Sequence, residues 1–192
     1  DGALDFLSLE NLIEYQISEG INALVSVGTT GESATVDVDE HLEVISCFVS
    51  VSNGRIPIIA GTGANSTKEA ISLTDGAKKI GADAALLVSP YYNKPTQEGL
   101  FLHFNEIAEK VDLPQIIYNV PSRTASNIDI STVKRLCSHR NIIGIKDATG
   151  DMSVLEGLQK ECRSEIDSGS FSLFSGDDET SFDFISKGGH GT

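Results

Sequence analysis

The chain has 192 residues, 40% of them hydrophobic, which suits one sizeable core and is short for two domains. Its net charge is −14 and its 14 basic residues are scattered, so a nucleic-acid partner is not expected. No apolar segment approaches the roughly 20 residues that cross a bilayer, and the first residues do not resemble a signal sequence. We therefore expect no membrane partner. Three cysteines without metal-binding spacing are typical of reduced thiols in the cytoplasm.

Helical and strand-like patterns alternate along the chain. Apolar residues at helical spacing, followed by Gly20 as a C-terminal cap, predict a first helix over residues 8–19. Residues 37–40 and 66–69 have the spacing of capping boxes. Further helices are predicted from about residue 37, over residues 66–80 and 100–111, from about residue 129, around residues 155–158, and shortly before residue 188. Apolar runs bounded by turn residues predict six strands, at residues 23–27, 57–60, 84–88, 115–118, 142–146 and 171–174.

The six strands recur at intervals of roughly 30 residues, which is the length of a repeated βα unit. Such alternation implies an α/β protein with a parallel sheet and outer helices. A doubly wound sheet would favour a glycine-rich phosphate-binding turn, but the chain has neither GxGxxG nor GxxxxGK[ST]. We therefore predict a single domain, residues 1–192, that forms a (β/α)8 TIM barrel, of which the chain supplies about six strands.

The strand at residues 142–146 ends in a lysine, Lys146, and turn-type residues follow it. Because side chains alternate along a strand, Ile142, Gly144 and Lys146 are predicted to share one face, with a gap at Gly144 beneath the lysine. A buried ammonium is costly unless it is paired, neutralised or used in chemistry. Its chain neighbour Asp147 points to the opposite face and is poorly placed to pair with it. We therefore interpret Lys146 as a functional group.

Polar residues follow the predicted strands. In a parallel barrel the carboxyl ends of the strands form one rim, where TIM-barrel enzymes carry their active sites. The polar residues at these ends are Thr29, Thr30, Asn65, Tyr91, Tyr92, Tyr118, Arg123, Lys146 and Asp177. Any one of them could serve packing or a turn, but their joint placement predicts an active site at this rim.

A lysine amine can add to a carbonyl and lose water to form an iminium, which stabilises a neighbouring carbanion as an enamine. This requires the neutral amine, and burial in a barrel lowers the pKa of a lysine. Tyr118 is the natural candidate for the proton transfers. The forked guanidinium of Arg123 suits a carboxylate.

Three motifs resemble those of one family. GTTGES at residues 28–33, YNVPSRT at residues 118–124 and GIKDATG at residues 144–150 are similar to signatures of the dihydrodipicolinate synthase (4-hydroxy-tetrahydrodipicolinate synthase) family. SPYYN at residues 89–93 and GDD at residues 176–178 extend the resemblance over nearly the whole chain. It implies a class I pyruvate-dependent carbon–oxygen lyase on a (β/α)8 barrel, usually a cytoplasmic homotetramer, that acts in the diaminopimelate route to lysine.

The resemblance also implies the catalytic residues. Lys146 would form a Schiff base with pyruvate, and the enamine would attack aspartate 4-semialdehyde before the product cyclises. Tyr118 would shuttle protons with Thr29 and with Tyr92, which in this family reaches into the site of a neighbouring subunit. The covalent intermediate on Lys146 takes the place of a cofactor, and no metal is expected.

Substrate-binding and regulatory residues follow from the same resemblance. Thr30 would hold the pyruvate carboxylate, Arg123 the semialdehyde carboxylate, and the backbone of Gly176 would line the pocket. Many members are inhibited by lysine at a dimer interface. The positions that match this site are Ser33, Ala34, His41, Asn65, Glu69 and Tyr91. Val38 departs from the pattern, because some regulated members have a histidine there.

The resemblance also implies elements that this sequence does not contain. Family members have a first barrel strand ahead of the segment that matches residue 1, and an eighth strand and a helical C-terminal domain beyond the segment that matches residue 192. We therefore expect a barrel that is incomplete at both ends, with two free strand edges.

Two alternatives to this function stay open. Sister families on the same scaffold, N-acetylneuraminate lyase and 2-keto-3-deoxy-sugar aldolases, share the lysine and the tyrosine, although Arg123 favours a small acidic aldehyde over a sugar. A non-catalytic barrel that binds pyruvate or an amino acid is the other alternative. The set formed by Lys146, Tyr118 and Thr29 argues against it.

Overall fold

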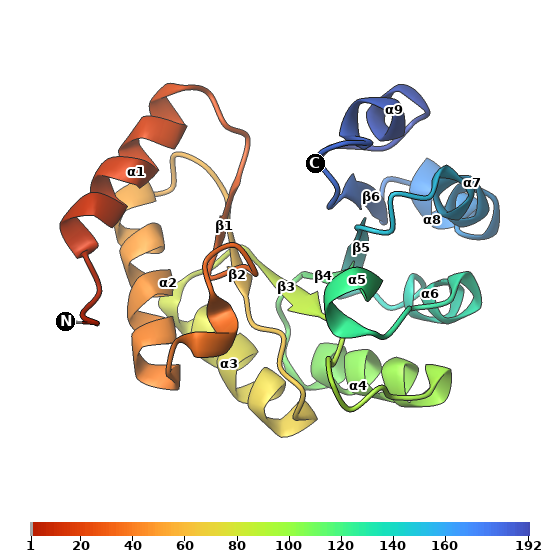
Figure 1. Cartoon of the computed structure of the whole chain (residues 1–192), viewed down its shortest axis with the longest axis horizontal. Coiled ribbons are helices and arrows are strands. Elements are labelled where there is room, and N and C mark those ends of the chain that lie inside the picture. Colours follow the sequence, from red (N-terminus) through yellow and green to blue (C-terminus); the bar gives the residue numbers. More distant parts are fainter. Residues whose placement is uncertain (1) are drawn as a thin grey trace.

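The computed structural model describes residues 2–192 and contains one curved parallel sheet with helices along its outer side (Figure 1). Its strands pair in chain order, each parallel to the next. The strands are β1 (Leu24–Ser26), β2 (Ile58–Gly61), β3 (Ala84–Val88), β4 (Gln115–Asn119), β5 (Ile142–Asp147) and β6 (Ser172–Ser175). All six predicted strands are present, and the prediction of a parallel α/β sheet is confirmed.

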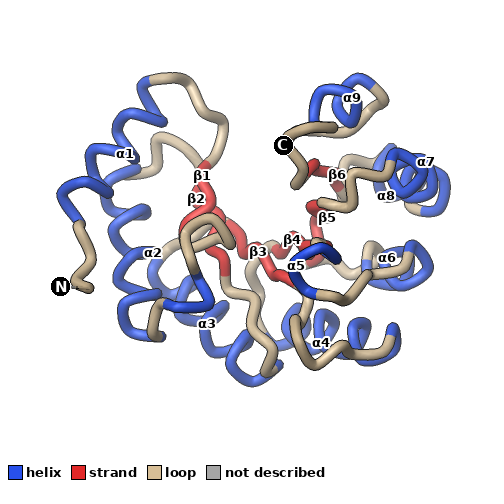
Figure 2. The backbone as a smooth tube through the Cα atoms, in the orientation of Figure 1, coloured by secondary structure: helices blue, strands red, loops and turns tan. Residues whose placement is uncertain are grey.

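The longer helices follow the outside of the arc that the strands trace in Figure 2. The longer helices are α1 (Phe6–Ser18), α2 (Val38–Ser52), α3 (Thr67–Ile80), α4 (Gln97–Lys110) and α7 (Met152–Glu161). The shorter ones are α5 (Pro121–Thr124), α6 (Ile130–Leu136), α8 (Arg163–Asp167), α9 (Ser181–Ser186) and a 3-10 turn, η1 (Ser33–Thr35). No helix within residues 2–192 is long and apolar enough to cross a membrane.

Side-chain caps determine where several helices begin. Asp37 accepts hydrogen bonds from two backbone N–H groups of the first turn of α2, and Ser66 accepts one from Glu69 at the start of α3, as predicted. Helix α1 begins at Phe6, two residues before the predicted start at residue 8. The cause is Asp5, whose carboxylate accepts the backbone N–H of Ser8 at 3.0 Å.

The sheet has a buried layer on each side. Between the sheet and its helices lies a large apolar cluster that includes Leu87, Ile117 and Ile145. On the inner, concave side a smaller cluster contains Leu86, Ile116 and Tyr118, with Phe174 packed against it. The alternation of these residues between the two sides is that of strands buried on both faces.

Strand β5 corrects one prediction. Ile142 is the partner of Gln115, but the next partner along β4, Ile116, pairs with Gly144, so Ile143 is an extra residue in β5. Such a β-bulge reverses the alternation of side chains at that point. Ile142 therefore lies in the outer cluster with Ile145, and only Gly144 and Lys146 keep the predicted common face.

The gap predicted beneath Lys146 is also not empty. A Cβ atom added to Gly144 would lie 3.3 Å from the ring of Phe174 and 2.7 Å from the carbonyl oxygen of Ser172. The vacancy that the glycine leaves is therefore occupied by the side chain and backbone of β6. The aromatic ring supports the inner face of β5 one step below the lysine.

The sheet does not close into a barrel. Within the described residues β1 pairs only with β2, and β6 pairs only with β5 among the named strands. Val25 of β1 is 42% exposed, which is unusual for a residue of a barrel strand and follows from the open edge. The arrangement agrees with the expected TIM barrel of about six strands.

Candidate active site

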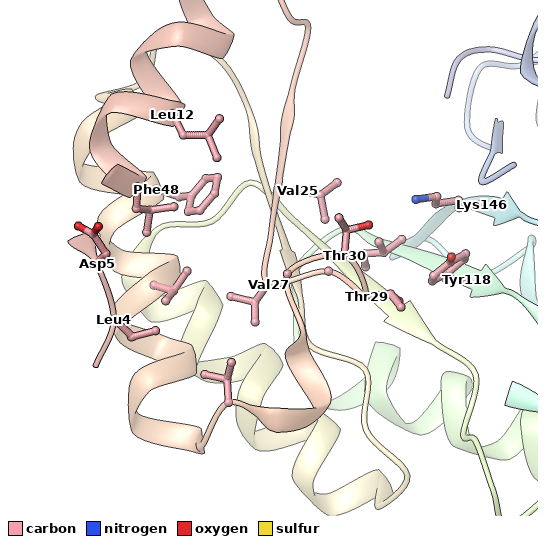
Figure 3. Close-up of a pocket in the computed structure, with 16 residues that line it drawn as sticks. Leu4, Asp5, Leu12, Val25, Val27, Thr29, Thr30, Phe48, Tyr118 and Lys146 are labelled. Carbon is pink, nitrogen blue, oxygen red and sulfur yellow. The ribbon is translucent and has the colours of Figure 1, made fainter. Parts of the chain in front are cut away.

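Lys146 and Tyr118 meet at the carboxyl ends of neighbouring strands. Their Cα atoms are register partners in β5 and β4. The lysine Nζ lies 4.8 Å from the centre of the tyrosine ring, and Figure 3 shows both side chains projecting toward the same cavity. The predicted pairing of an amine with a phenol is therefore present in the fold.

The surroundings of Lys146 favour its neutral form. Burial lowers the pKa of the ammonium below that of an exposed lysine, and the negative charge of Asp178 opposes the shift. Asp147 does not pair with the lysine, because its carboxylate lies on the other side of the strand and accepts hydrogen bonds from Asn119 and Thr149. A larger share of Lys146 is therefore nucleophilic near neutral pH than for a lysine in water.

The surroundings of Tyr118 favour its protonated form. Burial raises the pKa of the phenol, while the positive charge of Arg123 and a hydrogen bond with Thr29 act in the opposite direction. The phenol keeps its proton at neutral pH and can donate it. The two counteracting groups would stabilise the phenolate that forms when the proton leaves.

A cavity of about 490 Å³ opens in front of this pair (Figure 3). Thr29 and Thr30, from the turn that follows β1, line it together with Lys146 and Tyr118, as predicted. The cavity also extends across the free edge of β1 to side chains of the first and second helices and the segment before α1. These additional lining residues, which the sequence analysis did not select, include Leu4, Asp5, Leu9, Leu12, Val44 and Phe48.

Gly176 lies against the side chain of Lys146, which occupies the space where a side chain at residue 176 would be. A Cβ atom at this position would lie 2.9 Å from Cε of Lys146 and 2.9 Å from Cβ of Ala148. The absence of a side chain at Gly176 is therefore what allows the lysine to extend toward the cavity. Gly176 is not among the residues that line the cavity, so its role in the pocket wall stays a prediction, and what the structure shows is its contact with Lys146.

Two further predicted residues, Tyr92 and Arg123, do not line the cavity in this single chain. Tyr92 is 91% exposed, has a positive φ of 72°, and does not contribute to the cavity wall. Arg123, on the short helix α5, is exposed and acts on the site through its charge near Tyr118. The phenol of Tyr92 and the guanidinium of Arg123 are thus available to a second chain or to a substrate.

Most of the residues predicted to bind lysine surround a second, smaller cavity of about 90 Å³. Its wall contains Ser33, Ala34, His41, Glu69 and Tyr91, and Asn65 accepts the backbone N–H of Tyr91 at 3.0 Å. His41 is buried, which lowers its pKa, and its Nε2 donates to the carbonyl oxygen of Gly61 at 2.7 Å. The structure brings the predicted set together, along with Val38 and other apolar residues.

The model of the dihydrodipicolinate synthetase family matches residues 1–192. The chain belongs to this family. Its relatives agree: it is 57% identical over 191 residues to the 4-hydroxy-tetrahydrodipicolinate synthase of Ruthia magnifica subsp. Calyptogena magnifica, an alignment that covers 100% of this chain and 63% of the relative. The resemblance predicted from the three motifs is thereby confirmed.

Solved structures of the dihydrodipicolinate synthase family have the same backbone. The chloride-inhibited dihydrodipicolinate synthase from Acinetobacter baumannii, complexed with pyruvate, is 53% identical with a TM-score of 0.94, and the match covers 100% of this chain and 64% of that one. The enzyme from Cyanidioschyzon merolae with lysine bound is 37% identical with a TM-score of 0.93, over 99% of this chain and 63% of that one. This chain thus spans somewhat less than two thirds of the length of these relatives.

Proposed function

We propose that this chain carries the reaction centre of a 4-hydroxy-tetrahydrodipicolinate synthase, which condenses pyruvate with aspartate 4-semialdehyde through a Schiff base on Lys146. The observation that carries the proposal is the amine of Lys146, half-buried and 4.8 Å from the centre of the Tyr118 ring at the cavity. Family membership and the pyruvate complex of the Acinetobacter baumannii relative support it.

The first half of the reaction follows from these groups. The neutral amine adds to the keto carbon of pyruvate, a proton reaches the former carbonyl oxygen, and water leaves to give the iminium. Loss of a methyl proton gives the enamine. Tyr118, with the hydroxyl of Thr29 beside it, supplies and accepts these protons. The hydroxyl of Thr30 is the donor for the pyruvate carboxylate at the cavity wall.

The second half forms the new carbon–carbon bond. The enamine carbon attacks the aldehyde carbon of aspartate 4-semialdehyde, and the aldehyde oxygen takes up a proton. The amino group of the adduct then displaces Lys146 as the product cyclises, which restores the free lysine. In this scheme Arg123 holds the semialdehyde carboxylate with two parallel hydrogen bonds. Tyr92 completes the proton relay from a neighbouring subunit of a homotetramer, and its exposure is compatible with that role.

Replacing Arg123 with lysine tests the second substrate. The variant is expected to lower turnover of aspartate 4-semialdehyde by about 10- to 100-fold, because a point charge replaces a forked donor. Formation of the pyruvate Schiff base is expected to stay within about twofold of wild type, since lysine keeps a positive charge near Tyr118 and pyruvate does not bind Arg123 in this scheme. Steady-state turnover and borohydride trapping on the same preparation measure the two steps.

The alternatives predict other results when the wild-type protein is given pyruvate with a series of aldehydes. A sugar aldolase would turn over a sugar aldehyde, such as an N-acetylated hexosamine, faster than the semialdehyde. A non-catalytic barrel would bind pyruvate without turnover of any aldehyde. Equal loss of trapping and turnover in the Arg123 variant would contradict the role given to that residue.

The smaller cavity supports a second proposal, feedback binding of lysine. Its wall offers hydrogen-bond donors and acceptors for an amino acid, from Ser33, His41 and Glu69. The Cyanidioschyzon merolae relative is a complex with lysine. L-lysine at millimolar concentration is expected to raise the melting temperature and lower activity. Glu69→Gln should weaken both responses about 10-fold or more, because it removes the charge that would pair with an ammonium. Activity and melting curves unchanged by lysine would contradict the proposal.

A further inference from the structure

The side chain of Asn119 links three segments on the outer side of the sheet. Its Nδ2 donates to the carboxylate of Asp147 at 2.9 Å and to Oδ1 of Asn127 at 3.0 Å. Its Oδ1 accepts the backbone N–H of Ile128 at 3.0 Å. Both amide hydrogens and the amide oxygen are therefore used.

This amide lies directly behind the proposed reaction centre. Asn119 and Asp147 are register partners at the ends of β4 and β5, immediately after the register partners Tyr118 and Lys146. Because successive side chains of a strand point to opposite faces, the hydrogen-bonded pair is on the helix side while the phenol and the amine are on the cavity side. The ends of β4 and β5 therefore carry both the hydrogen-bonded pair and the pair formed by the phenol and the amine.

The two strands stay paired as far as Asn119 and Asp147, their last register pair. Just beyond it, the backbone N–H of Ala148 donates to the carbonyl oxygen of Asn119 at 2.8 Å. The bond between Asn119 and Asp147 is thus the side-chain tie across the last register pair. It constrains the twist of each strand end, and with it the direction of the preceding side chain.

The third link reaches the segment that carries Arg123. That residue lies on α5, and the chain returns past the end of β4 at residues 127–128, where both hydrogen bonds to Asn119 form. The carboxamide of Asn119 therefore joins three segments. They are the end of β5 with the proposed nucleophile, the end of β4 with the proton donor, and the segment that follows the carboxylate-binding group. No other side chain among the bonds at this rim contacts all three segments within the described residues.

The burial of the pair makes the link energetically significant. Asn119 is 1% exposed and Asp147 is 5% exposed. Within residues 2–192 the further donors to this carboxylate are the hydroxyl and the backbone N–H of Thr149, both from its own turn. Removing the amide would leave a buried carboxylate without its only donor from another strand, which is costly.

We propose that Asn119 and Asp147 are positioning residues that hold the Lys146 amine in register with the Tyr118 phenol. The inference rests on the proposed Schiff-base chemistry. It predicts that the rate of imine formation depends on the hydrogen bond between Asn119 and Asp147 more than on the identity of either residue.

The test is an exchange of the two side chains, read by the rate at which borohydride traps pyruvate on Lys146 in the purified protein. Asn119→Asp places two carboxylates against each other and is expected to slow trapping by about 10- to 100-fold, the effect of a displacement near 1 Å. Asp147→Asn alone keeps an oxygen that can accept the hydrogen bond from Asn119, so it should slow trapping less than Asn119→Asp does. The double variant Asn119→Asp with Asp147→Asn restores the bond with its direction reversed, and should recover most of the rate.

Asn141→Asp is the matched control. Asn141 is also a buried asparagine next to β5, and its Nδ2 donates to the carbonyl oxygen of Ala108 at 3.0 Å, but it lies at the opposite end of that strand. It should lower the melting temperature and leave trapping per folded molecule unchanged. Failure of the double variant to recover the rate, or equal slowing by Asn141→Asp, would overturn the positioning role. Absence of trapping in wild type would overturn the Schiff-base proposal and this inference with it.

Discussion

Replacing Lys146 with alanine is expected to lower synthase turnover by more than about 10⁴-fold, because the covalent route is lost with the amine. The fold is expected to persist, since the half-buried ammonium costs free energy through its partial desolvation and is not part of the apolar core. Lys146→Arg should be equally inactive, although it keeps a positive charge, because a guanidinium does not deprotonate to a nucleophile. Turnover with pyruvate and aspartate 4-semialdehyde measures the loss.

Lys160→Ala is the control for that experiment. Lys160 is on α7, its side chain is 82% exposed, and its nearest carboxylate is 3.9 Å away, so the change removes one positive charge at the surface. It should leave turnover within about twofold of wild type. Substantial turnover by a folded Lys146→Ala variant would show that the reaction does not pass through this amine.

Replacing Tyr118 with phenylalanine is expected to lower turnover by about 10²- to 10⁴-fold, the range for the loss of a general acid–base group. The ring remains to fill the inner cluster and to face the lysine, so the melting temperature should change little. Imine formation should slow as well, because the carbinolamine needs a proton donor to release water. Single-turnover trapping with pyruvate separates this effect from the second substrate.

Tyr15→Phe is a suitable control for Tyr118→Phe. Tyr15 is on α1, 58% exposed, and outside the cavity wall, so loss of its hydroxyl should not alter turnover. Trapping and turnover of Tyr118→Phe at wild-type rates would contradict the assignment of the phenol as the proton donor. Another hydroxyl near Lys146, such as that of Thr29, would then have to supply the protons.

Local rules were sufficient to predict the parallel sheet and the meeting of Lys146 with Tyr118 at its rim. Lys146 and Tyr118 each follow an apolar run that is bounded by turn residues, so a parallel sheet places them side by side near the strand ends. Each strand continues for one residue beyond the predicted end, to Asp147 and Asn119. The cap at Asp37 was equally visible, because its carboxylate and the first turn of α2 are close in sequence. These features depend on neighbours within one βα unit.

The features that the sequence patterns did not predict depend on contacts between segments that are distant in the chain. The extra residue Ile143 becomes visible only when β4 and β5 are paired, because nothing in an apolar run marks a bulge. The ring of Phe174 occupies the space at Gly144 for the same reason: it comes from the next strand. The cavity wall from the segment before α1 was missed because residues 1–6 have no periodicity to interpret.

Borohydride trapping of the wild-type protein with pyruvate alone shows whether Lys146 forms the imine. We expect one reduced pyruvate adduct, on the peptide that contains Lys146. We also expect a trapping rate that rises with pH and reaches half its maximum below about pH 10.4, the pKa of a free lysine, because burial favours the neutral amine. An unmodified Lys146, or an adduct found only on other lysines, would contradict the Schiff-base proposal.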